Sequence, residues 1–208
     1  MNNSFPNKLI LASLFLLQAC SVLQPVAVPS LILYRLELPK QVRKETLASP
    51  VVSIQLGHIH ADSGLDSKQM LYVNKPYQIN AFAQSQWQQT PALMLTPLVV
   101  SALEGSGQFQ VVLSPTVPMS ATYRLDLDII SLQQDFMVFP SQIHFGLRAY
   151  LSENKNSTLI ALHEFDITVA TSSEDAYGGV VASNIAVAQV LQQLTQFCYL
   201  QLFAPNQP

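Results

Sequence analysis

Three residues that could ligate a metal ion stand at alternate positions, His58, His60 and Asp62. On a β-strand, alternate side chains point to one face, so the two imidazoles and the carboxylate could together bind a divalent cation. This pattern also occurs at the end of the first strand of metal-dependent hydrolases built on barrels. Such a barrel needs about 250 residues, whereas this chain has 208 and only His144 and His163 as further imidazoles. We therefore interpret the motif as two histidines at a strand end and predict no metal site.

A second pattern with catalytic potential is the Ser-x-x-Lys spacing of Ser152 and Lys155. In serine acyl-enzymes this spacing places the lysine one helical turn from the nucleophile, but here we expect a hairpin turn. The sequence contains neither a Gly-Lys-Ser/Thr phosphate-binding loop nor a Gly-x-Ser-x-Gly nucleophile elbow. Two carboxylate pairs alternate on expected strands, Asp126 with Asp128 and Glu164 with Asp166. We interpret these pairs as solvated strand faces and predict a protein that is not an enzyme, with no catalytic residue and no cofactor.

The composition excludes several other classes of protein. Hydrophobic residues make up 49% of the chain and charged residues 11%, against about 25% charged in an average soluble domain. Ten Lys and Arg against thirteen Asp and Glu give a net charge of −3, and the pI is near 5.7. A basic face is the usual mark of a nucleic-acid-binding protein, so we expect no nucleic-acid partner. No apolar run reaches the roughly 18 to 20 residues that span a bilayer, which excludes a polytopic membrane protein.

The first twenty residues have the three regions of a secretory signal. A polar start with Lys8 precedes an apolar stretch from Leu9 to Leu17, and Ala19 precedes Cys20. The apolar stretch is about half of what a membrane-spanning helix needs, which argues against the alternative of an uncleaved anchor. The ending Leu-Gln-Ala-Cys resembles the bacterial lipobox, in which the cysteine is diacylated, exposed by cleavage and then N-acylated. We therefore predict a signal peptide over 1–19 and lipidation at Cys20.

Cleavage and lipidation have further consequences for the mature chain. Removal of the first 19 of 208 residues leaves 189 and takes away one lysine, so the net charge falls from −3 to −4. Residues 20–30 contain Pro25 and Pro29 and no charge, which predicts a short extended tether. Ser21 follows the cysteine in place of Asp, which in enteric-type sorting implies export to the outer membrane. Cys198 then remains as a single thiol, expected to be buried, with an intermolecular disulfide or a reactive nucleophile as alternatives.

Alternation of apolar and polar residues predicts several strands after the tether. They are expected over 31–38, 51–59, 69–73, 77–82, 109–113, 121–132, 136–151 and 158–170. Within the second of these, the alternation places Val52, Ile54, Leu56 and His58 on one face. The last three runs, of which the middle one is interrupted by Pro140, predict an antiparallel meander with one solvated face.

Two helices complete the predicted fold. Thr90 and Pro91 are a typical N-cap and first-turn proline, and the sequence Gly105-Ser106-Gly107 ends the helix. Pro97 would cost about 3 kcal/mol inside a helix, so a kink or a late start is expected. A long helix is predicted over 176–202, with a polar but uncharged side formed by Asn184, Gln189, Gln192, Gln193 and Gln196. These elements predict an α+β single domain over 31–208, with a mixed or antiparallel sheet and two main helices packed on one face.

A set of aromatic, leucine, proline and glycine residues resembles the pattern of a known family. It comprises Tyr72, Tyr77, Phe82, Trp87, Pro91, Leu95, Leu98, Leu103, Gly107, Phe109 and Val111. With the lipobox, the strand at Tyr34-Arg35-Leu36 and the long C-terminal helix, it is similar to the ABC-type transport auxiliary lipoproteins. These are the PqiC-like partners of MCE-type lipid-transport systems.

The resemblance implies a non-catalytic lipoprotein of a Gram-negative cell envelope, anchored in the outer membrane and facing the periplasm. Its partner would be an MCE-domain periplasmic protein, homo-oligomers are possible, and any ATP hydrolysis would belong to a separate subunit. Two alternatives stay open: a periplasmic lipoprotein hydrolase with a metal site at His58, His60 and Asp62, and a carrier that encloses an acyl chain. Tyr72, Tyr77 and Trp87 are expected in the core, with partner contact as the alternative.

Overall fold

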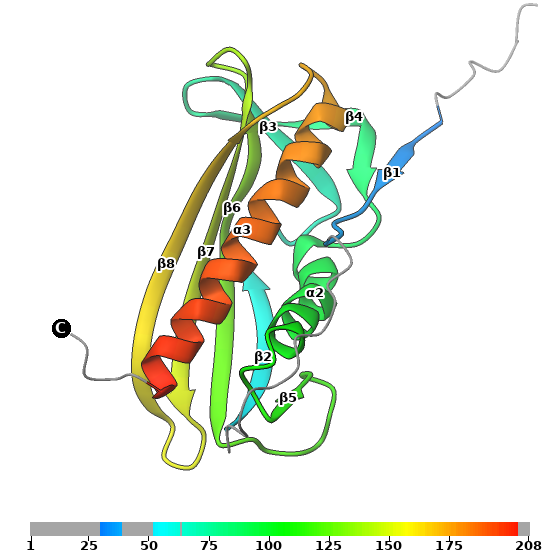
Figure 1. Cartoon of the computed structure of the whole chain (residues 1–208). Coiled ribbons are helices and arrows are strands. Elements are labelled where there is room, and N and C mark those ends of the chain that lie inside the picture. Colours follow the sequence, from blue (N-terminus) through cyan, green and yellow to red (C-terminus); the bar gives the residue numbers. More distant parts are fainter. Residues whose placement is uncertain (1–29, 39–51, 63, 204–208) are drawn as a thin grey trace, which may run out of the picture. The chain divides into compact units, whose positions relative to one another are not determined.

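The computed structural model describes residues 30–38, 52–62 and 64–203. In these ranges the chain forms the strands β1 (Ile32–Tyr34), β2 (Ser53–Ala61), β3 (Gln69–Lys75), β4 (Gln78–Trp87), β5 (Val111–Leu113), β6 (Tyr123–Asp135), β7 (Gln142–Glu153) and β8 (Thr158–Ala170) and the helices α2 (Pro91–Gly105) and α3 (Ala176–Phe203). Both helices lie on one face of a single mixed sheet (Figure 1). The predicted α+β single domain is confirmed. The predicted signal peptide, Cys20 and the tether up to residue 29 lie outside the described residues.

Strand β6 has neighbours along both of its edges. On one edge, β7 runs antiparallel to it from Tyr123 to Asp135. On the other edge, β2 lies parallel to its first half and β3 lies parallel to its last residues. Strand β8 continues the sheet beyond β7, β5 lies beyond β2, and β4 followed by β1 lie beyond β3 (Figure 1). The predicted meander is thus β6, β7 and β8.

Strand β2 contains a bulge that the sequence pattern did not reveal. Leu56 and Ile59 pair with β6 on either side of Asp126, so Gly57 and His58 together face that one residue. Gly57 permits this approach, because a Cβ there would lie 1.9 Å from Asp126 Oδ1. The bulge reverses the phase of the following side chains, so that Ile59 is buried and His58 is exposed. The predicted placement of His58 on the face of Leu56 is therefore wrong.

Strand β1 is shorter than the predicted strand over 31–38. It pairs with β4 through Ile32, Leu33 and Tyr34. Beyond this point the chain turns to helix α3, where the Glu37 N–H donates a hydrogen bond to Asn184 Oδ1 at 2.6 Å. A side chain of the helix thus replaces the strand partner, which ends the sheet at this edge.

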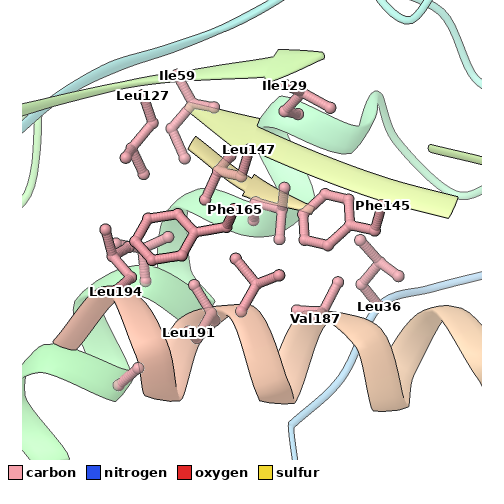
Figure 2. Close-up of a cluster of buried hydrophobic side chains, with 14 of the residues drawn as sticks. Leu36, Ile59, Leu127, Ile129, Phe145, Leu147, Phe165, Val187, Leu191 and Leu194 are labelled. Carbon is pink, nitrogen blue, oxygen red and sulfur yellow. The ribbon is translucent and has the colours of Figure 1, made fainter. Parts of the chain in front are cut away.

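The core lies between α3 and the inner face of the β6–β7–β8 meander. Ile129, Leu147 and Phe165 are direct neighbours on the three strands and are each at most 3% exposed. Leu191 and Leu194 of α3 point at this row, as Figure 2 shows. Burial of a leucine or phenylalanine side chain contributes about 1.5 to 3 kcal/mol, so this contact layer holds helix and sheet together.

Helix α2 begins at Pro91 and ends at Gly105, as predicted, with Pro97 inside it. The late start that Pro97 suggested does not occur. A proline removes the hydrogen bond to the carbonyl four residues earlier, here that of Leu93. Leu93 and Pro97 both lie on the exposed side of the helix, so the proline does not interrupt the side that packs into the core.

Helix α3 begins at a capping carboxylate. Asp175 Oδ1 accepts hydrogen bonds from the Gly178 N–H at 2.8 Å and from the Ser173 hydroxyl at 2.7 Å. Both hydrogen bonds lower the pKa of the Asp175 carboxyl, and the bond from the Gly178 N–H has the larger effect. The N-terminus of the helix is therefore satisfied by a residue of the chain itself.

Replacement of Leu147, which is fully buried at the centre of the core, should lower the free energy of unfolding. Leu147→Ala removes the contact between sheet and helix and leaves a cavity, with an expected loss of about 3 kcal/mol. The matched control is Leu93→Ala, because Leu93 is 60% exposed; its expected loss is below about 1 kcal/mol. Urea denaturation of both variants measures the two losses, and equal losses would contradict the described core.

Candidate docking groove

The structure places His144 and His163 on other strands than His58 and His60. His58 and His60 are exposed on β2, whereas His144 of β7 faces Thr168, with 3.1 Å between Nδ1 and Oγ1. His163 packs on the opposite face of the meander against α3. Among the described residues, no three His, Cys, Asp or Glu side chains are arranged to hold a metal ion.

The other residues whose spacing suggested catalysis are likewise not arranged for it. Ser152 lies at the end of β7 and Lys155 in the turn before β8, so no helix brings them one turn apart. Asp126 binds the Arg124 guanidinium with 2.8 Å between Oδ2 and Nε, and the hydrogen bond to Asp126 raises the pKa of Arg124. Glu164 pairs with Arg148 at 3.0 Å. The solvated strand faces predicted for these carboxylates are observed.

Cys198 lies on the buried side of α3 with no exposed surface. Burial raises the pKa of its thiol from the ordinary value of 9.0 to about 12. The thiolate is the reactive form of cysteine, so this environment makes the side chain chemically inert at neutral pH. The predicted burial of Cys198 is confirmed.

An open groove lies between β8 and α3 and has a volume of about 1020 Å³. Its lining comes from one strand and one helix that lie side by side (Figure 1). The lining residues are Ala161, Leu162, His163, Phe165, Gln189, Gln192, Gln193, Gln196, Phe197, Leu200 and Gln201. None of them is an acid, a lysine or an arginine, so the groove offers apolar surface and neutral amide groups.

The helical wall of the groove has an unusual composition for an exposed surface. Helix α3 has 28 residues and contains no Asp, Glu, Lys or Arg. Four exposed glutamines lie three and four residues apart and so line one side of the helix, Gln189, Gln192, Gln193 and Gln196. Depletion of charge is a property of the centres of protein interfaces rather than of ordinary solvated surfaces.

Aromatic side chains form the floor of the groove. The His163 ring stacks on Phe197 with 5.5 Å between ring centroids and an interplanar angle of 26°. The same ring meets the edge of Phe165 at 4.6 Å, and Phe165 meets Phe197 at 6.0 Å. This cluster fixes β8 against α3 and holds the two walls at a set spacing.

A separate pocket inside the core bears on the carrier hypothesis. It lies between β3, β4, β6 and α3 beside Trp87 and holds about 10 Å³, which is about the space of one water molecule. This pocket is too small for an acyl chain. Trp87, at 3% exposed, is a core residue as predicted, whereas Tyr77 is fully exposed, so its predicted core position is wrong.

Sequence reasoning identified the glutamines of α3 but not the groove beside them. The missing information was the order of strands, because alternation along 158–170 does not show that β8 lies at an edge. Neither His163 nor Phe197 is marked as a binding residue by its sequence context. A histidine among apolar residues, such as His163, is common in a strand. The charge-free length of α3 was the available clue.

Together, the fold and the groove define an α+β module with an open, uncharged surface suited to binding a partner. The sequence over residues 34–195 matches the family model described as ABC-type transport auxiliary lipoprotein component. This match covers more than half of the chain, and the chain belongs to that family. No curated protein matches the sequence.

Solved structures share the same fold. Protein XCC0632 from Xanthomonas campestris has a TM-score of 0.72 at 21% identity, with 85% of this chain and 99% of that chain covered. An uncharacterized protein has a TM-score of 0.65 at 12% identity, with 81% and 99% covered. The hypothetical protein CT253 from Chlamydia trachomatis has a TM-score of 0.53 at 10% identity, with 74% and 98% covered. At these identities the likeness supports the fold alone.

The inert environment of Cys198 predicts a specific pattern of thiol reactivity. In the Cys20→Ser variant, Cys198 is the one thiol left in the chain. Ellman's reagent at pH 8 should leave it unmodified in the folded protein and titrate it fully in denaturant. Rapid reaction of the folded protein would contradict the buried position.

The pKa of Cys198 also sets the sign of a pH effect on stability. Between its ordinary value of 9.0 and about 12, the thiol ionises in the unfolded chain but stays protonated in the folded one. The unfolded state then binds fewer protons, so the free energy of unfolding falls as pH rises through this range. Cys198→Ala should lack this part of the pH dependence.

Proposed function

We propose that this protein is a non-catalytic accessory component of an ABC lipid-transport system of the MCE type. The match of residues 34–195 to the transport auxiliary family is the observation that carries the proposal. The uncharged groove between β8 and α3 supports it, because a docking module needs an exposed surface from which water can be removed at low cost. ATP hydrolysis belongs to another subunit of the system.

The proposal includes a lipid anchor at Cys20, with the signal peptide over 1–19, the tether over 20–30 and the folded domain over 31–208. Stable membrane attachment requires more than one acyl chain, a condition met by the diacylation and N-acylation of a lipobox cysteine. Within the described residues, neither helix is long and apolar enough to cross a bilayer. An eleven-residue tether reaches at most about 40 Å at about 3.3 to 3.6 Å per residue, so the domain stays close to the membrane surface.

The proposed location is the periplasmic face of the outer membrane, and the proposed partner is an MCE-domain periplasmic protein. Ser21 after the lipidated cysteine supports sorting to the outer membrane. A component anchored there can link a transport system of the inner membrane to its destination. The protein would then hold the MCE-domain partner at the outer membrane, and the transported lipid would move through the partner.

Affinity capture of the full-length protein from crosslinked native membranes tests this proposal. The wild-type protein should recover an MCE-domain protein and should take up radiolabelled palmitate. Cys20→Ser should abolish palmitate uptake and reduce capture at least tenfold, because the domain loses its place at the membrane. Cys198→Ala is the matched control, which also removes one thiol and should leave both readouts unchanged. Failure of the wild-type protein to recover an MCE-domain protein, while a known complex is captured, would contradict the proposal.

A further inference from the structure

We propose that the free edge of β8 binds an extended segment of a partner protein, which adds to the sheet as a further strand between β8 and α3. The segment has a lysine or arginine beside Asp166 on the outer face of the sheet and uncharged side chains towards α3. This inference rests on the proposed docking function and names the chemistry of the docked segment.

Strand β8 is an open edge in the part of the chain that the structure describes. It pairs with β7 along one side, and alternate residues of an antiparallel strand direct their N–H and C=O groups to the other side. These groups are a template for a further strand, which would lie about 4.7 to 4.9 Å away. Addition of a strand at such an edge, beside a helix, is an established mode of peptide recognition.

The edge has few of the features that normally prevent strand addition. Native edge strands are commonly protected by lysine, proline, a bulge or a very short length. Strand β8 has 13 residues and contains no lysine or proline. Its register with β7 shifts only near its start, and the pairing is regular from Leu162 to Ala170. The edge is thus regular from Leu162 to Ala170, and its charged residues, Glu164 and Asp166, favour a strand of complementary charge.

The groove defines the side chains that face α3. In an added strand, alternate side chains would point towards the helix and meet the exposed amides of Gln192 and Gln196 and the rings of His163 and Phe197. Neutral amides and aromatic faces accept apolar or uncharged polar side chains without the cost of burying an unpaired charge. An acidic or basic side chain on this face of the segment would find no opposite charge in the groove lining.

The outer face of β8, unlike the groove side, carries charged side chains. Glu164 and Asp166 project there from β8, and Glu164 is neutralised by Arg148 of β7 at 3.0 Å. Asp166 pairs with Gly146, which has no side chain, and Asp166 forms no ion pair among the described residues. A lysine or arginine on the added strand beside Asp166 would supply the missing charge, since opposite charges on neighbouring strands are favourable.

The same charges disfavour the pairing of two β8 strands centred on Phe165. In an antiparallel pair of two β8 strands centred on Phe165, Glu164 of one copy would lie opposite Asp166 of the other. Like charges in directly opposed positions are destabilising. That register is therefore disfavoured, and Asp166, which forms no ion pair among the described residues, favours an extended segment of a different protein with a basic residue at this position.

Binding of synthetic peptides to the full chain in detergent tests the inference. The probe is a fluorescent nine-residue peptide that alternates lysine with valine, compared with a glutamate–valine peptide and with a lysine–valine peptide N-methylated at alternate residues. Fluorescence anisotropy should give a dissociation constant at least tenfold lower for the first peptide than for the other two. Amide chemical shifts should change along β8 and the groove side of α3.

Asp166→Lys should reverse the preference in favour of the glutamate–valine peptide. Glu104→Lys, an equal change of charge at the exposed end of α2, is the matched control and should leave the preference unchanged. Equal binding of all three peptides, or shift changes elsewhere on the protein, would overturn the inference. Self-association through β8 that the lysine–valine peptide does not displace would also overturn it.

Capture from membranes separates this inference from the proposed function. If wild-type protein and Asp166→Lys recover an MCE-domain protein equally well, the docking function stands and the strand-addition inference fails. If the peptide binds as described but no MCE-domain protein is recovered, the inference stands as a peptide site and the proposed transport function fails.

Discussion

The pairing of β6 on both of its edges is the constraint on which the rest of the structure depends. One edge is filled by β7, and the other is shared end to end by β2 and β3. Since these parallel neighbours come from earlier in the chain, β6 joins the two halves of the sequence into one sheet. The alternate side chains of β6 that are apolar all point to one face of the sheet. Both helices pack on that face, which buries these side chains. The meander that follows ends at β8 because α3 turns back over it (Figure 1).

Helix α3 links this architecture to the proposed role. Its apolar side closes the core through Leu191 and Leu194, so its orientation is fixed by packing rather than by surface charge. Its other side is then free to carry glutamines beside the edge of β8. Ring contacts between His163, Phe165 and Phe197 order the walls of this uncharged groove before a partner binds, which reduces the side-chain ordering that binding costs. In the proposed function, the groove binds the partner protein and the lipid anchor at Cys20 holds the domain at the membrane.

Much of this fold could be predicted from the sequence, because periodicity is a local property. The alternation in 158–170 and the helical spacing in 176–202 gave elements that match β8 and α3 almost residue for residue. The bulge at Gly57 could not be predicted, since it depends on Asp126 far along the chain. The short β1 likewise depends on Asn184. The candidate groove escaped prediction for the same reason: strand order is set by tertiary packing, and only that order makes β8 an edge.

Site-specific photo-crosslinking in intact cells can show directly whether the groove between β8 and α3 contacts an MCE-domain protein. A photoreactive phenylalanine derivative placed at Gln192, an exposed residue of the groove, reports which molecule contacts α3 in the native envelope. The same derivative at Asp128, on the opposite face of the sheet, is the reference position. We expect a crosslink to an MCE-domain protein from Gln192 and none from Asp128. A crosslink to that protein from Asp128 alone would contradict the assignment of the groove as the docking surface.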